Sequence, residues 1–127
     1  MYCLATPTVL GIFRGDAVLK PRLEQLAEAH AHFSITPNTL ATLYAIASKA
    51  EKKHDALRLV EEFSESVSVL EVTPAAAKKH AELLAGGIKL SAEDLWTAVL
   101  CIVHGQALVV RELEPWRKVP GLKLEKW

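Results

Sequence analysis

Residues 91–127 read S-A-E-D-L-W-T-A-V-L-C-I-V-H-G-Q-A-L-V-V-R-E-L-E-P-W-R-K-V-P-G-L-K-L-E-K-W, and this stretch decides the fold class. An acidic start followed by a nearly continuous apolar run predicts a helix over residues 91–104, which Gly105 ends. The apolar run 108–110 then predicts a strand that is buried on both faces, as strands of parallel sheets are. A helix that leads into a doubly covered strand indicates an α/β protein.

The rest of the chain repeats this alternation of helices and strands. Three Thr-Pro pairs predict helix starts, because threonine caps a helix and proline suits its first turn; they are Thr6-Pro7, Thr36-Pro37 and Thr73-Pro74. We expect strands at 2–4, 33–36, 67–72, 107–110 and 122–124, and helices at 8–13, 17–29, 37–50, 55–64, 74–85 and 91–104. This order predicts one α/β domain over residues 1–127, with a mostly parallel central sheet flanked by helices on both faces.

Composition narrows the class of function. The 15 Lys and Arg residues balance the 15 Asp and Glu residues, so no long-range attraction to nucleic acid is expected. Cys3 and Cys101 fall inside a predicted strand and a predicted helix, where free thiols are usually buried, and they fit a reducing compartment. No apolar run reaches the ~20 residues of a membrane span, and no basic region precedes an apolar stretch at the N-terminus. We expect a cytoplasmic protein without membrane contact.

Ligands of open parallel sheets bind outside the carboxyl ends of the strands, and this rule selects the positions to inspect. Asp94 at a helix start and Glu112 just after a strand are acids at this edge, with Glu93 and Glu114 close by. Carboxylate oxygens are the ligands that Mg²⁺ prefers, and such sites activate water against phosphodiesters. Asp94 and Glu112 are therefore the candidate metal ligands and catalytic residues. Each also has a structural interpretation, since an acid stabilises a helix N-terminus and loop charges are usually solvated.

Five short motifs stand at the predicted strand ends and helix starts. They are, in order, L-A-T-P at 4–7, I-T-P-N-T-L-A-T-L at 35–43, D-L-W-T-A-V at 94–99, L-V-V-R-E at 108–112, and V-P-G-L at 119–122 after Trp116. In this order and spacing they resemble the motifs of PIN domains, the nuclease fold of VapC-type toxins. Those motifs read L-D-T-N, I-S/T-x-x-T-x-A-E-L, D-L-x-I-A-A-x-A, L-V-T-N-D/N and V-P-G-L. The resemblance covers nearly the whole chain.

The resemblance implies four acidic positions that hold Mg²⁺ or Mn²⁺. Here they are Ala5, Thr42, Asp94 and Glu112, so two of the four acids are absent. Arg111 would add a positive charge beside the site, which disfavours a cation. Ala5 alone could be an introduced Asp→Ala knockout of a toxic nuclease. Natural degeneration is favoured, because it also explains Thr42 and Arg111.

We therefore predict a degenerate PIN-domain protein that lacks metal-dependent nuclease activity and needs no cofactor. By the resemblance it would form a homodimer and bind a small antitoxin-like protein, with RNA as a further candidate ligand. The alternative is an active Mg²⁺- or Mn²⁺-dependent endoribonuclease of a toxin–antitoxin pair that uses Asp94, Glu112 and Glu93. A flavodoxin- or receiver-like binding module is a third interpretation, disfavoured because receivers need paired acids after the first strand.

Three further features each have two interpretations. Trp116, with basic residues such as Arg117 beside it, could stack a nucleic-acid base, or it could be a core aromatic next to solvated charges. The helix at 37–50 carries apolar residues on more than one side, which predicts either a partner surface or burial on both sides within the monomer. The pair His30 and His32 could bind a metal only with further ligands, and is otherwise a pair of structural or solvated histidines.

Overall fold

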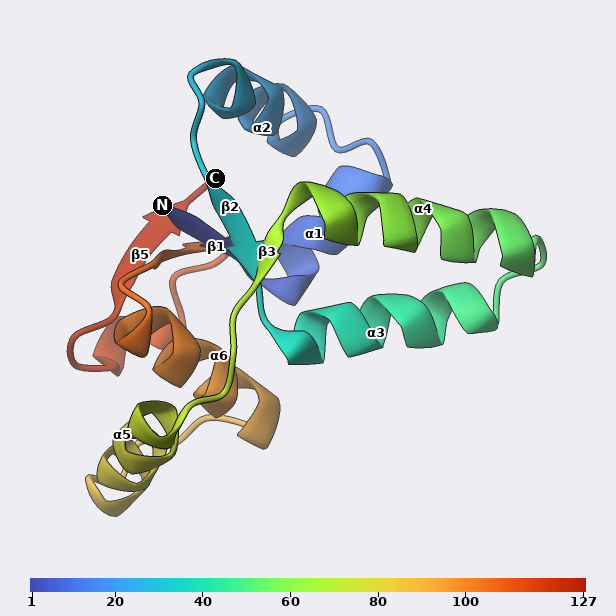
Figure 1. Ribbon diagram of the computed structural model, residues 1–127. Coiled ribbons are helices and arrows are strands. Elements are labelled where there is room, and N and C mark those ends of the chain that lie inside the picture. Colours follow the sequence, from blue (N-terminus) through green and yellow to red (C-terminus); the bar gives the residue numbers. More distant parts are fainter.

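The computed structural model describes residues 1–127 and has a five-stranded, wholly parallel sheet in the order β3-β2-β1-β4-β5 (Figure 1). The strands are β1 Tyr2–Leu4, β2 Phe33–Ile35, β3 Ser68–Val69, β4 Ala107–Val110 and β5 Lys123–Lys126. The helices are α1 Thr6–Phe13, α2 Leu19–Glu28, α3 Pro37–Ser48, α4 Lys53–Ser66, α5 Pro74–Ala85 and α6 Ala92–Val103, with a 3-10 turn η1 at Trp116–Lys118. The predicted α/β class is confirmed, and the sheet is parallel throughout.

The central strands β1 and β4 are buried on both faces, because successive side chains of a strand point to opposite sides. Cys3 and Leu108 belong to a core shared with α5 and α6, whereas Leu4 and Val109 belong to a core shared with α1, α3 and α4. All four side chains are fully buried. The helices therefore cover both faces of the sheet, as the continuous apolar run at residues 108–110 predicted.

Three helices begin where the capping residues predicted them. A side-chain hydroxyl accepts the backbone N–H three residues later: Thr36 Oγ1 from Thr39 at 3.2 Å, Thr73 Oγ1 from Ala76 at 3.2 Å, and Ser91 Oγ from Asp94 at 3.1 Å. Each bond satisfies one of the free donors of the first helical turn.

The first helix departs from the prediction, in which Thr6 was the cap. Helix α1 begins at Thr6 itself, and Ala5 is the capping residue without a side-chain bond. The Ala5 carbonyl accepts the N–H of Val9 at 3.1 Å. The Thr6 hydroxyl instead lies 2.8 Å from the Thr39 hydroxyl of α3, so a tertiary contact takes the group that local sequence assigned to capping.

Several boundaries also differ from the predicted ones; for example, α2 begins at Leu19 instead of residue 17, and β5 ends at Lys126 instead of residue 124. Strand β3 covers two residues, not 67–72, because it is an exposed edge strand and the chain then turns away toward α5. Its continuation still donates one bond, from Leu70 N–H to the Ile35 carbonyl at 2.9 Å. Helix α4 covers Lys53–Ser66 and so extends two residues beyond the predicted 55–64 at each end.

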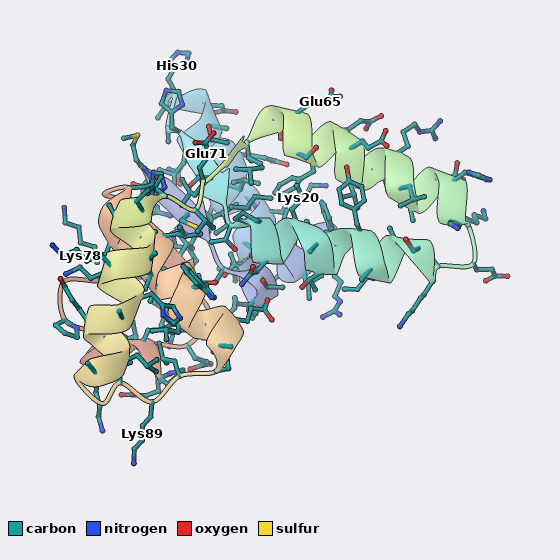
Figure 2. The ribbon with its side chains drawn as sticks, turned by 60° about the horizontal axis from the view of Figure 1, so that its bottom comes forward. Lys20, His30, Glu65, Glu71, Lys78 and Lys89 are labelled. Carbon is teal, nitrogen blue, oxygen red and sulfur yellow. The ribbon has the colours of Figure 1, made fainter.

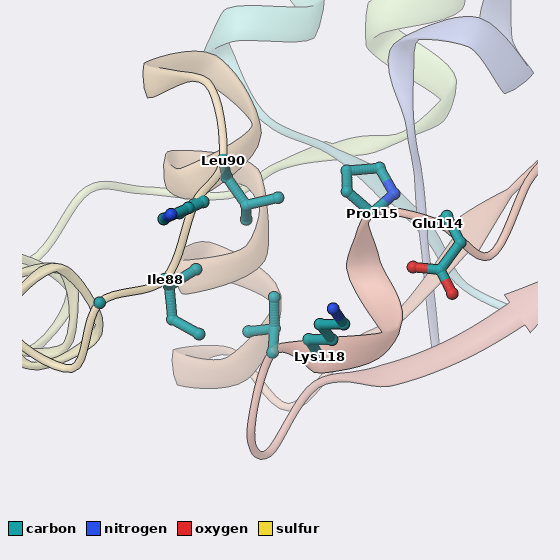
Figure 3. Close-up of a pocket in the computed structure, with 8 residues that line it drawn as sticks. Ile88, Leu90, Glu114, Pro115 and Lys118 are labelled. Carbon is teal, nitrogen blue, oxygen red and sulfur yellow. The ribbon is translucent and has the colours of Figure 1, made fainter.

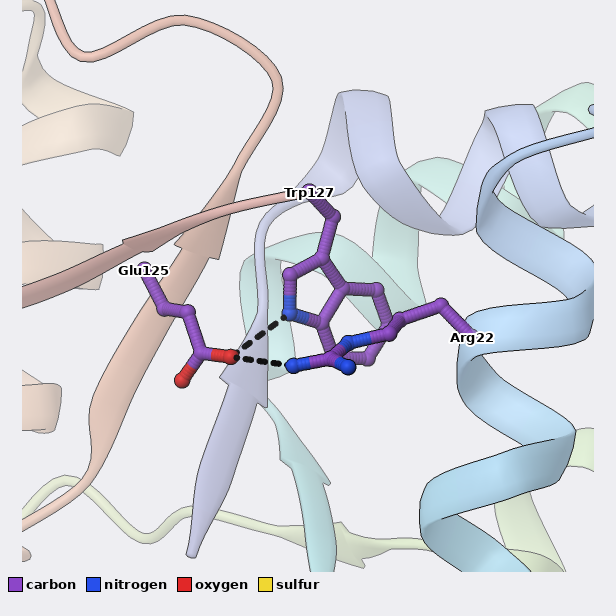
Figure 4. Close-up of polar contacts among 3 residues, drawn as sticks. All are labelled: Arg22, Glu125 and Trp127. Atoms are coloured by element: carbon purple, nitrogen blue, oxygen red, sulfur yellow. Dashed lines mark hydrogen bonds and ion pairs between the residues drawn. The ribbon is translucent and has the colours of Figure 1, made fainter.

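The last strand fastens α2 to the sheet (Figure 4). Glu125 Oε1 accepts from Arg22 Nη2 at 3.3 Å and from the Trp127 indole N–H at 3.2 Å. The Trp127 ring packs against Tyr2 and Phe33 at centroid separations of 6.2 and 6.3 Å. Helix α2 itself packs through buried Leu19 and partly buried Leu23, and the Arg22 pair adds a contact to the last strand.

The polar exterior agrees with the composition. Lys78 and Lys89 project outward around α5 (Figure 2). None of the helices combines the length and the apolar composition needed to cross a membrane. Cys3 and Cys101 are buried free thiols, as predicted, and hydrogen bonding to Cys3 together with burial raises the pKa of the Cys101 thiol.

Candidate functional site

The strand order creates a switch point between β1 and β4. From β1 the chain builds β2 and β3 on one side, then crosses to build β4 and β5 on the other. In open parallel sheets the crevice at the carboxyl ends of such a strand pair is where ligands bind. Ala5 follows β1 at this edge, and its N–H donates to the Val109 carbonyl at 3.1 Å. Arg111 follows β4 at the same edge.

A cleft of about 240 Å³ opens at this point of the sheet. It is lined by Ala5, Pro7, Asp94, Val110, Arg111, Glu112, Glu114, Pro115 and Trp116. The structure thus brings three of the four predicted positions, Ala5, Asp94 and Glu112, to one cleft. Glu114 joins them, because the loop after β4 folds back before η1.

Two residues considered with this site do not line the cleft. Thr42 lies on α3, where its hydroxyl donates to the Asn38 carbonyl one turn earlier at 3.0 Å. Glu93 lies on α6 next to Asp94, and its carbonyl accepts from the Thr97 hydroxyl at 3.1 Å. Neither side chain is part of the cleft wall.

Threonine hydroxyls connect the helix starts beside the cleft. Thr39 Oγ1 lies 2.8 Å from Thr6 Oγ1 and accepts from Thr36 Oγ1 at 3.2 Å, while Thr8 Oγ1 donates to the Val109 carbonyl at 3.0 Å. Three of these residues, Thr8, Thr36 and Thr39, are buried. The sequence signalled only the capping role of Thr36; the link from α1 to α3 depends on the tertiary fold. These neutral hydroxyls hold the helix starts together without adding negative charge.

Arg111 forms an ion pair with the turn between α1 and α2, outside the cleft wall. Its Nη1 lies 3.1 Å from Asp16 Oδ2. The other carboxylate oxygen, Asp16 Oδ1, accepts the backbone N–H groups of Val18 and Leu19 at 2.9 and 3.0 Å. These bonds to Leu19 and Val18, with the Arg111 charge as a smaller cause, hold the pKa of Asp16 below its ordinary value of 3.8.

The lowered pKa of Asp16 predicts a pH-dependent contribution to stability. Because the folded state favours the charged carboxylate, the contribution is fully present above pH 3.8 and is lost as the pH falls from there through the lowered folded-state pKa. We expect Asp16→Asn, which keeps the acceptor oxygen but removes the charge, to lower Tm at pH 7, with a deficit that shrinks as the pH falls below 3.8. Thermal melts between pH 2 and pH 7 measure this.

Asp55→Asn is the matched control, since the pair of Asp55 with Arg58 on α4 joins two exposed side chains at 3.4 Å. Such pairs contribute little, so this variant should follow the native curve. A Tm deficit of Asp16→Asn that stays constant down to pH 2 would contradict the assignment.

Comparisons with known proteins agree on the architecture. No protein-family model matches the sequence, and no curated protein matches it. Among solved structures, a chain of VapBC2 from Rickettsia felis, bound to a promoter DNA fragment, superposes with a TM-score of 0.85 at 23% identity, covering 99% of this chain and 98% of that one. DNA-bound VapBC from Salmonella typhimurium gives 0.83 at 24% identity, with 99% and 97% covered. VapBC-1 from nontypeable Haemophilus influenzae gives 0.84 at 18% identity, also with 99% and 97% covered. The chain has the PIN-domain fold of VapC toxins.

The PIN fold implies a divalent metal ion at this cleft, and the side chains of this chain do not fit one. Mg²⁺ is held by about six oxygens, with carboxylates close enough to share it. No group of three or more His, Cys, Asp or Glu side chains is placed to hold a metal ion anywhere in the structure, and this includes His30 and His32. Ala5 contributes no side-chain oxygen to the cleft wall, and Arg111 contributes a positive charge.

A second pocket of about 350 Å³ adjoins the PIN cleft and shares Glu114 and Pro115 with it (Figure 3). Lys89 and Lys118 line it together with Ile88, Leu90 and Val119. Of the basic residues near the C-terminus, Lys118 therefore lies here, while Arg117 pairs with Glu114 at 3.7 Å. Trp116 is 8% exposed and belongs to the core of α5 and α6, which supports its interpretation as a core aromatic.

An apolar groove of about 410 Å³ runs between α1, α3 and α4 of the PIN domain. Ten of its eleven lining residues are hydrophobic: Leu10, Ile12, Phe13, Leu43, Ile46, Ala47, Ala50, Ala56, Leu59 and Val60, with Lys20 as the eleventh. Three of them are large and exposed, namely Phe13 at 44%, Ile46 at 49% and Leu59 at 59%. Contiguous exposed apolar residues of this kind mark interaction sites on soluble proteins.

Proposed function

We propose that this chain is a degenerate PIN-domain protein that acts by binding a protein partner and does not cleave RNA by metal-dependent hydrolysis. The observation that carries the proposal is the lining of the cleft. At the carboxyl end of β1 the wall has a methyl group, Ala5, where an acid would be needed, and Arg111 lines the same cleft after the neighbouring strand β4. The cleft therefore lacks a metal ligand at this position and carries a guanidinium that repels a divalent cation.

The partner we propose is a small antitoxin-like protein that places an apolar helical segment in the groove between α1, α3 and α4. An amphipathic helix suits such a groove, because its apolar side chains recur on one face. The solved relatives from Rickettsia felis, Salmonella typhimurium and Haemophilus influenzae are VapBC complexes, which supports a protein as the occupant. The only charged residue of the groove is Lys20, so an acidic residue at the edge of the segment would be favoured.

Two further parts of the proposal follow from the same fold. A homodimer is proposed, because a 127-residue domain with several large exposed apolar side chains has more such surface than one helical segment covers. RNA remains a candidate ligand for the pocket lined by Lys89 and Lys118. The setting we propose is the cytoplasm, where Cys3 and Cys101 stay reduced.

The second candidate function is an active Mg²⁺- or Mn²⁺-dependent endoribonuclease. One observation favours it: the carboxylates of Asp94, Glu112 and Glu114 line the same cleft. In that case these side chains would hold the metal ion, which would supply an activated water for attack on a phosphodiester. Glu93, the other acid considered, does not line the cleft.

Incubation with structured and single-stranded RNA separates the two functions. We expect no cleavage above background by the purified chain at millimolar Mg²⁺ or Mn²⁺, with Asp94→Asn indistinguishable from it, because the cleft lacks two of the acids that such sites use. The readout is product formation on denaturing gels. Metal-dependent cleavage by the native chain that Asp94→Asn abolishes would favour the nuclease and overturn the proposal.

A further inference from the structure

Arg111 is held in place from two sides. On one side its Nη1 lies 3.1 Å from Asp16 Oδ2, while Asp16 Oδ1 is fixed by the N–H groups of Val18 and Leu19. On the other side it passes over Gly11 of α1, where an added Cβ would lie 3.0 Å from Nη1. The absence of a side chain at Gly11 therefore leaves the room that the guanidinium occupies.

The cleft beside this guanidinium has an excess of negative charge. Asp94, Glu112 and Glu114 line it together with Arg111 as its one basic residue, and of these acids Glu114 also pairs with Arg117 at 3.7 Å. A cleft of about 240 Å³ is small against the ~8–10 Å over which salt screens charges, so the charges on its walls act on one another. No acid of the cleft forms an ion pair with Arg111, whose only carboxylate partner is Asp16 outside the cleft wall.

From this geometry we infer that Arg111 is the resident cation of the cleft. Asp16 and Gly11 hold its charge beside the three carboxylates, where it offsets their charge and repels a divalent metal ion. The inference rests on the proposed function, because it explains why this PIN cleft does not hold a metal ion. Restoring the missing acids would then be insufficient for tight metal binding as long as Arg111 remains.

Mn²⁺ titration followed by electron paramagnetic resonance tests this on the full chain. The variants are Ala5→Asp/Thr42→Glu, the same pair with Arg111→Gln, and the same pair with Arg111→Lys. A unit charge within several ångströms of a divalent ion shifts its affinity by roughly tenfold or more at the dielectric of a protein surface. We expect the triple variant with Arg111→Gln to bind Mn²⁺ about tenfold more tightly than the double variant does. The triple variant with Arg111→Lys keeps the positive charge, so its Mn²⁺ affinity should be close to that of the double variant.

Arg58→Gln in the double variant is the matched control, because Arg58 lies on α4, is exposed and lines neither the cleft nor the groove. It should change Mn²⁺ affinity less than twofold. If the double variant and its Arg111→Gln derivative bound Mn²⁺ with equal affinity, the inference would be overturned. Mn²⁺ binding to the native chain at micromolar concentration would instead contradict the proposed function, so the two failures are distinguishable.

Ala5 is buried, and an acid there could prevent folding, so a second arm uses the native background. The measurement is NMR line broadening by millimolar Mn²⁺. In the single variant Arg111→Gln we expect the amide resonances of Asp94, Glu112 and Glu114 to broaden. In the native chain and in the single variant Arg58→Gln we expect the same resonances to stay sharp. If the broadening is the same in all three proteins, or absent from all three, the inference is overturned. This test does not depend on the variants that restore the acids.

Discussion

Replacement of Trp116 by alanine is expected to destabilise the protein strongly and to leave any affinity for RNA unchanged. Trp116 is 8% exposed and packs in the core with Ala5, Leu95 and Val110 beneath the cleft. Deletion of a buried tryptophan costs about 3–5 kcal/mol, which lowers Tm by roughly 10–20 °C in a domain of this size. Denaturant and thermal unfolding measure the effect, and fluorescence anisotropy with labelled single-stranded RNA measures affinity.

Two control variants are compared with Trp116→Ala. Trp116→Phe keeps a ring in the core and should lose less than half as much stability. Leu84→Ala removes a leucine that is 59% exposed on α5, and should stay within ~0.5 kcal/mol of the native chain. If Trp116→Ala kept the native Tm and weakened RNA binding, Trp116 would be a stacking platform for bases and its assignment to the core would be wrong.

Charges placed in the apolar groove are expected to abolish partner binding. Ile46 on α3 and Leu59 on α4 both line the groove and are 49% and 59% exposed. The double variant Ile46→Glu/Leu59→Glu would bury two unpaired carboxylates against an apolar helix, so we expect at least ~100-fold weaker binding with little change in fold stability. The partner to test is the small antitoxin-like protein proposed above. Isothermal titration calorimetry of the co-expressed and separated proteins gives the affinity.

Leu84→Glu is the matched control for the groove. Leu84 has the same exposure as Leu59 but lies on α5, away from the groove. Binding should be unchanged in this variant. A complex that tolerates Ile46→Glu/Leu59→Glu but is lost in Leu84→Glu would move the interface to α5, and the absence of any complex would contradict the proposed occupant.

The order of elements could be predicted from local sequence, because its signals are short-range. Three capping hydroxyls and the apolar run at residues 108–110 each act within one turn or one strand, and the structure confirms them. The edge strand β3 was predicted too long, since an exposed strand has no burial to extend it. Thr6 was misassigned as a cap because its partner, Thr39, is 33 residues away.

The candidate site was predictable in position but not in composition. The rule that ligands bind beyond parallel strands selects Ala5, Asp94 and Glu112, and these do line one cleft. Thr42 was expected with them, but its short side chain bonds back along α3 and is not part of the cleft wall. The pairing of Arg111 with Asp16 could not be predicted, because it depends on how the α1–α2 turn approaches the end of β4.

The central claim is that this PIN cleft does not hold a divalent metal ion, and Mn²⁺ titration of the native chain tests it most directly. Electron paramagnetic resonance distinguishes free aquo Mn²⁺ from protein-bound Mn²⁺ at the same total concentration. The account predicts that the signal of the native chain stays that of free Mn²⁺ up to millimolar concentration, and that Asp94→Asn gives the same curve. One equivalent of Mn²⁺ bound at micromolar concentration, and lost in Asp94→Asn, would contradict it.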